Sequence, residues 1–129
     1  MTFVSTHVLD TSRGCPAQGV PVTLAVRAGS GAPWVPHGTS RTDADGRCKD
    51  LPDPPDGTTH VRLEFATERY LTGRCSARAR AEDRSDTAGA GGGGAFFPEV
   101  ATVFAVEPGR HYHVPLLLNP FGYSVYRGS

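Results

Sequence analysis

Long hydrophobic runs and paired cysteines are both missing from this sequence of 129 residues. Its longest aliphatic stretch, 114–118, contains a proline and is far shorter than the about 20 residues that a membrane-spanning helix needs. The three cysteines, Cys15, Cys48 and Cys75, form no Cys-x-x-Cys pair. Such an odd set argues against a disulfide scaffold and against a zinc knuckle. The sequence therefore predicts reduced thiols and no membrane partner.

An excess of charge of either sign is missing too. The 13 basic and 13 acidic residues cancel, so the summed field gives no reason to expect a nucleic acid or an anionic membrane as a partner. The start lacks the basic and apolar segments of a signal peptide, which favours a cytoplasmic protein. A peroxisomal location stays open, although the final Arg-Gly-Ser is not a Ser-Lys-Leu type signal. The length suits one domain, 1–129, with a single core.

Apolar residues alternate with polar ones wherever the sequence is regular, which is typical of half-buried strands. The candidate strands are Phe3–Leu9, Val20–Val26, Trp34–Arg41, His60–Phe65, Val100–Val106, His111–Leu118 and Tyr123–Tyr126. The turn sequence Asp43–Gly46 indicates a hairpin, since Gly46 can adopt a positive φ. Only Thr67–Leu71, with Thr67 as the N-cap, suits a helix. We expect an all-β protein, a two-sheet antiparallel β-sandwich with one short helix.

The alternation stops between residues 72 and 95. Arginines and acidic residues are followed there by a glycine-rich run, a composition that cannot bury enough surface to form structure, so we expect a flexible surface loop. Two strands, Val100–Val106 and Tyr112–Leu118, are instead apolar on both faces. Because a sandwich buries one face of each sheet internally, the second face predicts contact with another subunit. The alternative is that the segment Ala66–Ala95 covers these strands within one chain.

Histidines and one arginine are the candidates for chemistry. His111 and His113 point to the same face of a strand, and His7 can join them if its strand lies in the same sheet. An imidazole with a pKa of about 6.5 can accept or donate a proton at neutral pH. Arg47 follows the tight turn, where its guanidinium can form two parallel hydrogen bonds to adjacent acceptors. Each histidine, taken alone, is more often a surface or hydrogen-bonded structural residue, and a turn arginine is more often simply solvated.

Four separated motifs give the chain a resemblance to a known family. They are Ser5–Asp10, Thr42–Cys48, Phe96–Val100 and the C-terminal segment His111–Ser129. In this order they resemble the 5-hydroxyisourate hydrolases, the transthyretin-related enzymes of urate breakdown. The resemblance implies a transthyretin-like sandwich of two four-stranded sheets assembled as a homotetramer, a dimer of dimers. The family usually has a much shorter connection at the position of residues 72–95, so the resemblance implies that this segment is an insertion.

The resemblance further implies the site and its reaction. The catalytic residues would be His7, Arg47, His113 and Ser129, with Tyr126 also lining the substrate site. The reaction would be hydrolysis of 5-hydroxyisourate to 2-oxo-4-hydroxy-4-carboxy-5-ureidoimidazoline. It would need no metal or cofactor, because the two histidines activate a water molecule while Arg47 stabilises the charge on the tetrahedral oxygen.

Two other functions stay open at this point. A transthyretin-like carrier would use the same fold to bind a small ligand without catalysis, and fold alone does not distinguish the two. A zinc hydrolase would use His7, His111 and His113 as metal ligands with an open position for water. His111 matches no catalytic position of the family, so we expect it to be structural. Arg127 directly follows Tyr126, so in extended chain their side chains point to opposite faces, which suggests a role for Arg127 at a subunit interface.

Overall fold

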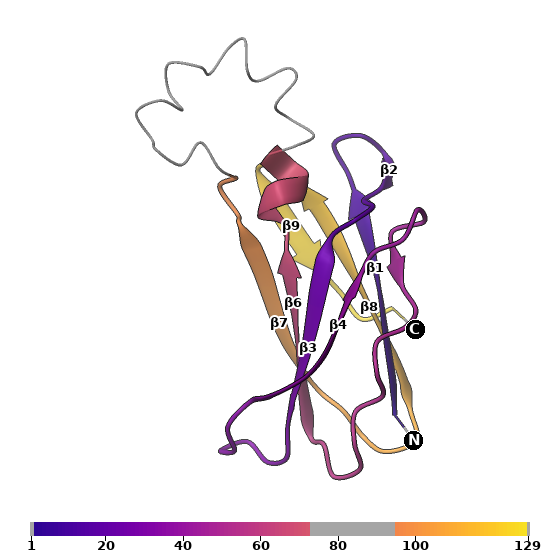
Figure 1. Ribbon diagram of the computed structural model, residues 1–129, viewed down its shortest axis with the longest axis vertical. Helices are drawn as coiled ribbons and strands as arrows, with labels where there is room; N and C mark the ends of the chain where they lie inside the picture. Colours follow the sequence, from indigo (N-terminus) through magenta and orange to yellow (C-terminus); the bar gives the residue numbers. More distant parts are fainter. Residues whose placement is uncertain (1, 73–94, 129) are drawn as a thin grey trace.

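The computed structural model describes residues 2–72 and 95–128. In this part of the chain two β-sheets lie face to face (Figure 1). The strands are β1 (Phe3–Asp10), β2 (Cys15–Pro16), β3 (Pro21–Arg27), β4 (Val35–Arg41), β5 (Arg47–Cys48), β6 (His60–Ala66), β7 (Glu99–Ala105), β8 (His111–Asn119) and β9 (Gly122–Val125). Sheet A has the order β2-β1-β8-β9, with β5 also paired to β1, and sheet B has the order β4-β3-β6-β7. The predicted two-sheet sandwich is confirmed.

The core lies between the sheets and is built by every second residue of the strands. In β1 the even-numbered residues are buried, and in β6 the odd-numbered ones are. The largest fully buried side chains are Phe65, Leu24, Leu63, Leu116 and Leu118. Burying each such side chain stabilises the fold by about 1.5–3 kcal/mol. In both β1 and β8 the even-numbered side chains point into the core, so the odd-numbered side chains lie on the outer face of sheet A.

Strands β1 and β8 are parallel neighbours at the centre of sheet A. Ser5 pairs with His113 in this register, and His7 pairs with Pro115. The sequence pattern predicts antiparallel sheets, and this pair is an exception. All four strands of sheet B lie between β1 and β8 in the sequence, so the two strands are joined by a long crossover, which a parallel pair requires. The pairing brings residues from the two ends of the chain onto adjacent strands (Figure 1).

The turn 43–46 forms, but the hairpin does not. Gly46 has a φ of 77°, and its N–H donates to the carbonyl of Asp43 at 2.8 Å. The expected hairpin is wrong because the flanking strands belong to different sheets: β4 pairs with β3, whereas β5 pairs with β1. A Cβ at residue 46 would lie 2.5 Å from the carbonyl oxygen of Val8. Glycine is therefore required both for the turn and for its close approach to β1.

The helix covers residues 68–72 and starts after Thr67, as predicted. The N–H of Leu71 donates to the Thr67 carbonyl at 2.9 Å, and the Thr67 hydroxyl donates to the Phe97 carbonyl at 2.6 Å. Most of the expected loop 72–95 lies outside the described residues. No helix in the described ranges is long and apolar enough to cross a membrane.

The two strands with apolar residues on both faces have different surroundings. Val103 of β7 is 51% exposed on the outer face of sheet B. In β8, which lies between β1 and β9, Pro115 is buried within the single chain although its position has outer-face parity. The expected second apolar face is therefore clearest on β7, an edge strand.

Candidate active site

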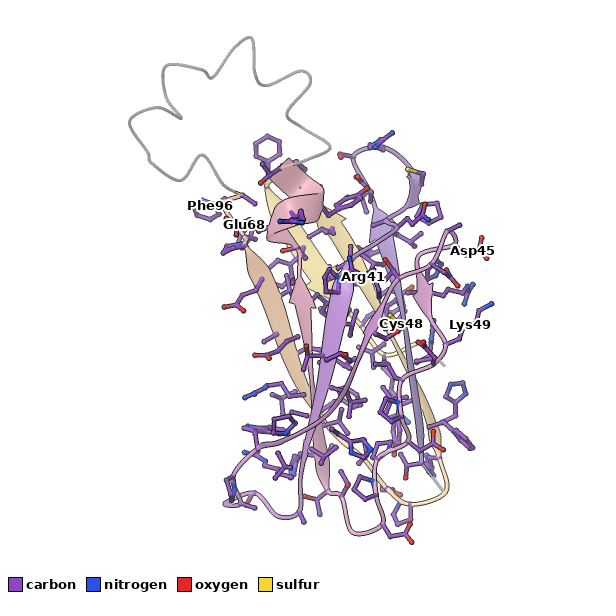
Figure 2. The ribbon with its side chains drawn as sticks, viewed as in Figure 1. Arg41, Asp45, Cys48, Lys49, Glu68 and Phe96 are labelled. Atoms are coloured by element: carbon purple, nitrogen blue, oxygen red, sulfur yellow. The ribbon has the colours of Figure 1, made fainter. Side chains whose placement is uncertain are left out.

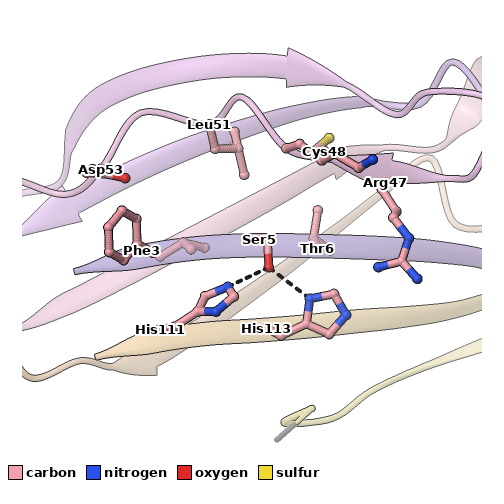
Figure 3. Close-up of a pocket in the computed structure, with 11 residues that line it drawn as sticks. Phe3, Ser5, Thr6, Arg47, Cys48, Leu51, Asp53, His111 and His113 are labelled. Carbon is pink, nitrogen blue, oxygen red and sulfur yellow. Dashed lines mark hydrogen bonds between the residues drawn. The ribbon is translucent and has the colours of Figure 1, made fainter. Parts of the chain in front are cut away.

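His7 and His113 lie together on the outer face of sheet A. They come from adjacent parallel strands, and their ring centroids are 6.5 Å apart. Ser5 lies directly opposite His113 in the register, and its Oγ is 2.9 Å from Nδ1 of His113. The same Oγ is 3.0 Å from Nε2 of His111 (Figure 3). The three predicted histidines thus share one face, as their parity and the pairing of the two strands require.

His7 is held by the turn that precedes β5. Its Nε2 lies 2.8 Å from the carbonyl oxygen of Asp45. Because a carbonyl only accepts, the proton of the neutral imidazole is on Nε2 and its Nδ1 is left as the acceptor. The turn itself is fixed by Asp43, whose Oδ1 accepts the N–H groups of Asp45 at 2.9 Å and Arg47 at 3.0 Å. The hydrogen bond from the Arg47 N–H lowers the pKa of Asp43, so its carboxylate stays charged in neutral solution.

Arg47 pairs with His7 across β5 and β1 and is itself exposed. Its guanidinium extends over β1 on the side of the His113 ring that faces away from Ser5 (Figure 3). In the same segment, Asp45 and Lys49 project outward (Figure 2). This arrangement places a fixed positive charge beside the imidazoles.

A cavity of about 340 Å³ opens beside these side chains. Its lining is Phe3, Val4, Ser5, Thr6, Arg47, Cys48, Lys49, Leu51, Asp53, His111 and His113. Burial raises the pKa of the Cys48 thiol, which makes it a poor nucleophile at neutral pH. The cavity therefore offers imidazole, guanidinium and hydroxyl groups for binding and proton transfer.

The protonation of His113 suits a base. Burial lowers the pKa of His113 below its ordinary 6.5, and the positive charges of Arg47, His7 and His111 lower it further. The imidazole is therefore neutral at pH 7 and able to accept a proton.

The C-terminal segment continues along β8 as an extra antiparallel stretch. The N–H of Gly128 donates to the His113 carbonyl at 2.8 Å, and the N–H of Tyr126 donates to the Pro115 carbonyl at 3.3 Å. Gly128 thus lies directly beside His113. Ser129, the next residue, lies outside the described residues, so its place in the site stays a prediction.

Tyr126 and Arg127 border a second cavity, of about 380 Å³, and not the first. Tyr126 has the parity of the outer face and is 50% exposed, and its place at the substrate site stays a prediction. The guanidinium of Arg127 lies over the ring of Tyr112, 5.4 Å from its centroid. Arg127 is thus directed away from the histidines, as its alternation with Tyr126 suggests.

Sequence reasoning missed Ser5, Lys49 and Asp53 as lining residues. Ser5 could have been found, since it has the parity of His7 and pairs with His113 once β1 and β8 are adjacent. Among the described residues, no group of three or more His, Cys, Asp or Glu side chains is arranged to hold a metal ion. His7 lies beside a carbonyl oxygen, while His111 and His113 share one hydroxyl, so the three imidazoles have different hydrogen-bond partners.

Comparison with known proteins bears on the family to which the chain belongs. The model of the HIUase/Transthyretin family matches residues 4–128. The chain belongs to this family. The matched range includes three of the four predicted catalytic residues, His7, Arg47 and His113. Family membership supports the transthyretin-like fold and allows both hydrolysis and ligand carriage.

Individual members of the HIUase/Transthyretin family cover nearly the whole chain. The 5-hydroxyisourate hydrolase of Salmonella typhimurium is 38% identical, covering 98% of this chain and 81% of the relative. The uric acid degradation bifunctional protein of Arabidopsis thaliana is 39% identical over 98% of this chain, which spans only 37% of that longer protein. The structure of Klebsiella pneumoniae 5-hydroxyisourate hydrolase aligns over 100% of both chains with 30% identity and a TM-score of 0.66. Sea bream transthyretin in complex with thyroxine aligns over 97% of this chain and 93% of its own, with 27% identity and a TM-score of 0.73.

Proposed function

We propose that this protein hydrolyses 5-hydroxyisourate to 2-oxo-4-hydroxy-4-carboxy-5-ureidoimidazoline. The observation that carries the proposal is that His113 and Arg47 line one cavity and that the His7 ring lies 6.5 Å from the His113 ring, in a chain similar along its length to 5-hydroxyisourate hydrolases. A cyclic amide is opened when water adds to its carbonyl carbon and the carbon–nitrogen bond breaks. The protein must therefore activate water, hold the ring and stabilise a developing negative charge.

The proposed mechanism uses side chains alone, without a metal ion. Neutral His113 accepts a proton from water while His7 holds that water through its unprotonated Nδ1. General-base assistance of this kind contributes about 10²- to 10⁴-fold to a rate. Arg47 binds the ring oxygens and stabilises the tetrahedral oxyanion, where one donor contributes about 3–4 kcal/mol. Ser129 orients the substrate or the water, and Tyr126 borders the site from a neighbouring subunit or after substrate binds.

A carrier function on the same fold is the second candidate, as thyroxine binding by sea bream transthyretin illustrates. The outer face of sheet A disfavours it here. Ser5, His7, Arg47 and His113 are polar groups that an apolar ligand would bury without partners, at about 1–3 kcal/mol for each group left unsatisfied. A substrate rich in carbonyl and N–H groups would instead satisfy them.

We also propose that the enzyme is a homotetramer, a dimer of dimers. The support is family membership together with apolar side chains that the single chain leaves exposed on edge strands, Val103 on β7 and Tyr123 on β9. Light scattering of the purified protein should give the mass of four chains. A monomeric mass at working concentration would contradict the assembly and leave the hydrolase proposal to be judged by activity.

Following the decay of freshly prepared 5-hydroxyisourate by its ultraviolet absorbance tests the proposed activity. We expect wild-type protein to accelerate the decay, and His7→Ala, His113→Ala and Arg47→Ala each to fold and to lose about 10²-fold or more in kcat/KM. Ser30→Ala, in the exposed loop between β3 and β4, is the control. Wild-type protein that leaves the spontaneous decay unchanged would overturn the proposed function.

A further inference from the structure

The hydroxyl of Ser5 contacts both histidines of the His-x-His segment, His111 and His113. Its Oγ lies 2.9 Å from Nδ1 of His113 and 3.0 Å from Nε2 of His111 (Figure 3). Ser5 lies opposite His113 in the β1–β8 register. The next residues of the two strands, Thr6 and Val114, are buried, so the backbone of Ser5 is held in place. The geometry is therefore fixed by two central strands and not by a loop.

A hydroxyl carries one proton, so Ser5 can donate to only one of the two imidazoles. If it donates to Nδ1 of His113, the proton of neutral His113 is on Nε2, which cannot then accept another. If Ser5 donates to Nε2 of His111, it accepts from an Nδ1–H of His113, and Nε2 of His113 is left free as a base. The direction of one hydroxyl thus decides which tautomer His113 adopts.

The surroundings favour the second arrangement. The guanidinium of Arg47 lies on the side of the His113 ring opposite Ser5 (Figure 3). Its positive charge attracts a lone pair and repels an N–H, so a bare Nε2 is favoured on that side and the proton is favoured on the Ser5 side. His7 and His111 are the other titratable groups whose charges act on His113, and Lys49 and Asp53 line the same cavity.

We propose that Ser5 is a positioning residue that selects the Nδ1–H tautomer of His113, with His111 as the acceptor that sets the direction of the Ser5 hydroxyl. The inference rests on the proposed hydrolysis and deepens it. In the reaction, water gives one proton to Nε2 of His113, and its oxygen bonds to the substrate carbonyl carbon while the carbonyl π electrons move to the oxygen to form the oxyanion. The resulting imidazolium keeps its Nδ1–H donated to Ser5, so no existing hydrogen bond has to break. When the carbon–nitrogen bond then breaks, Nε2 of His113 returns the proton to the leaving ring nitrogen. This gives His111, which matches no catalytic position of the family, a function through Ser5.

Nitrogen-15 NMR of the histidines in the full-length protein tests the tautomer, and kinetics on 5-hydroxyisourate test its consequence. In wild type we expect the Nδ1–H form of His113. Ser5→Ala should mix the two tautomers and lower kcat about tenfold, the loss equivalent to one hydrogen bond, with KM within about twofold. Ser5→Thr keeps the hydroxyl and should restore both readouts, and Ser30→Ala should change neither.

His111 supplies a second, independent pair of variants. His111→Phe removes the acceptor, so the Ser5 hydroxyl should turn to Nδ1 of His113, shift it to the Nε2–H form and lower kcat by a similar factor. His111→Gln keeps an acceptor oxygen and should retain more activity than His111→Phe. Because His111 is exposed, both variants should fold.

The outcomes separate this inference from the proposed function. An Nε2–H tautomer of His113 in wild type, or an unchanged tautomer and kcat in Ser5→Ala, would overturn the role of Ser5 while leaving the hydrolase intact. Wild type that does not consume 5-hydroxyisourate would overturn the hydrolase. The tautomers of wild type and Ser5→Ala would still decide whether Ser5 positions His113.

Discussion

Gly128 is where the C-terminal segment touches the proposed base, and Gly128→Ala is the most informative single change. A Cβ on residue 128 would lie 2.9 Å from Cδ2 of His113, and 3.3 Å from both the His113 carbonyl oxygen and Cδ of Pro115. Two of these three neighbours belong to fixed parts of β8. The third, the imidazole, is held on its other side by Ser5 at 2.9 Å.

Two relaxations are available to the variant. If the imidazole turns, it loses its hydrogen bond to Ser5, and if the segment lifts away, the N–H of Gly128 loses the His113 carbonyl. Either loss costs about 0.5–1.5 kcal/mol, and overpacking in general costs about 1–3 kcal/mol. Because both changes displace a group at the reacting centre, we expect kcat to fall about 10- to 100-fold, equivalent to about 1.4–2.7 kcal/mol in the barrier. The core is untouched, so the variant should still fold, with a melting temperature lowered by roughly 2–8 °C for each kcal/mol lost.

Decay of 5-hydroxyisourate and thermal unfolding should be measured on the same preparations. Gly122→Ala is the matched control, since a Cβ there meets nothing within 4 Å. We expect this control to keep wild-type kinetics. Wild-type kcat and KM in Gly128→Ala would show that the C-terminal segment does not determine the position of His113.

Two further predictions concern charge at the site. Because burial and then Arg47 lower the pKa of His113, kcat/KM should not depend on pH near pH 7 and should fall only as the pH drops through a midpoint below 6.5. Arg47→Gln removes one of the positive charges that lower this pKa, so it should move the midpoint of the pH–rate profile upward. Replacing Asp43 with Ala removes the acceptor for two N–H groups of the turn, so Arg47 should be held less firmly and KM should rise roughly threefold to tenfold in steady-state assays. A midpoint above 6.5 in wild type, or an Asp43→Ala variant with unchanged KM, would contradict the respective argument.

Alternation in the sequence predicted most strands and the parity of the site, but not which strands are neighbours. The odd-numbered positions of β1 and β8 share a face only because these strands pair in parallel, and a period-two pattern carries no information on pairing partners. The same limit explains the wrong hairpin: Asp43–Gly46 predicted a turn, and only the pairing of β5 with β1 shows that the chain changes sheets there. Arg47 was identified through its resemblance to a family motif, since a turn arginine alone indicates no function.

Stability and chemistry are carried by opposite faces of the same two strands. The inner face of β1 and β8 includes Val8, Thr6 and Leu116, all with 0% exposure, and the Thr6 hydroxyl donates to the Val114 carbonyl at 2.6 Å. Truncating Leu116 to Ala should therefore cost about 2–5 kcal/mol of unfolding free energy.

Substitutions on the outer face leave this core unchanged. Ser5, His7 and His113 can therefore differ without loss of the sandwich. The outer-face side chains, and not the fold, then decide between hydrolysis and binding. This separation accounts for a family in which one backbone is shared by 5-hydroxyisourate hydrolases and by a transthyretin that binds thyroxine.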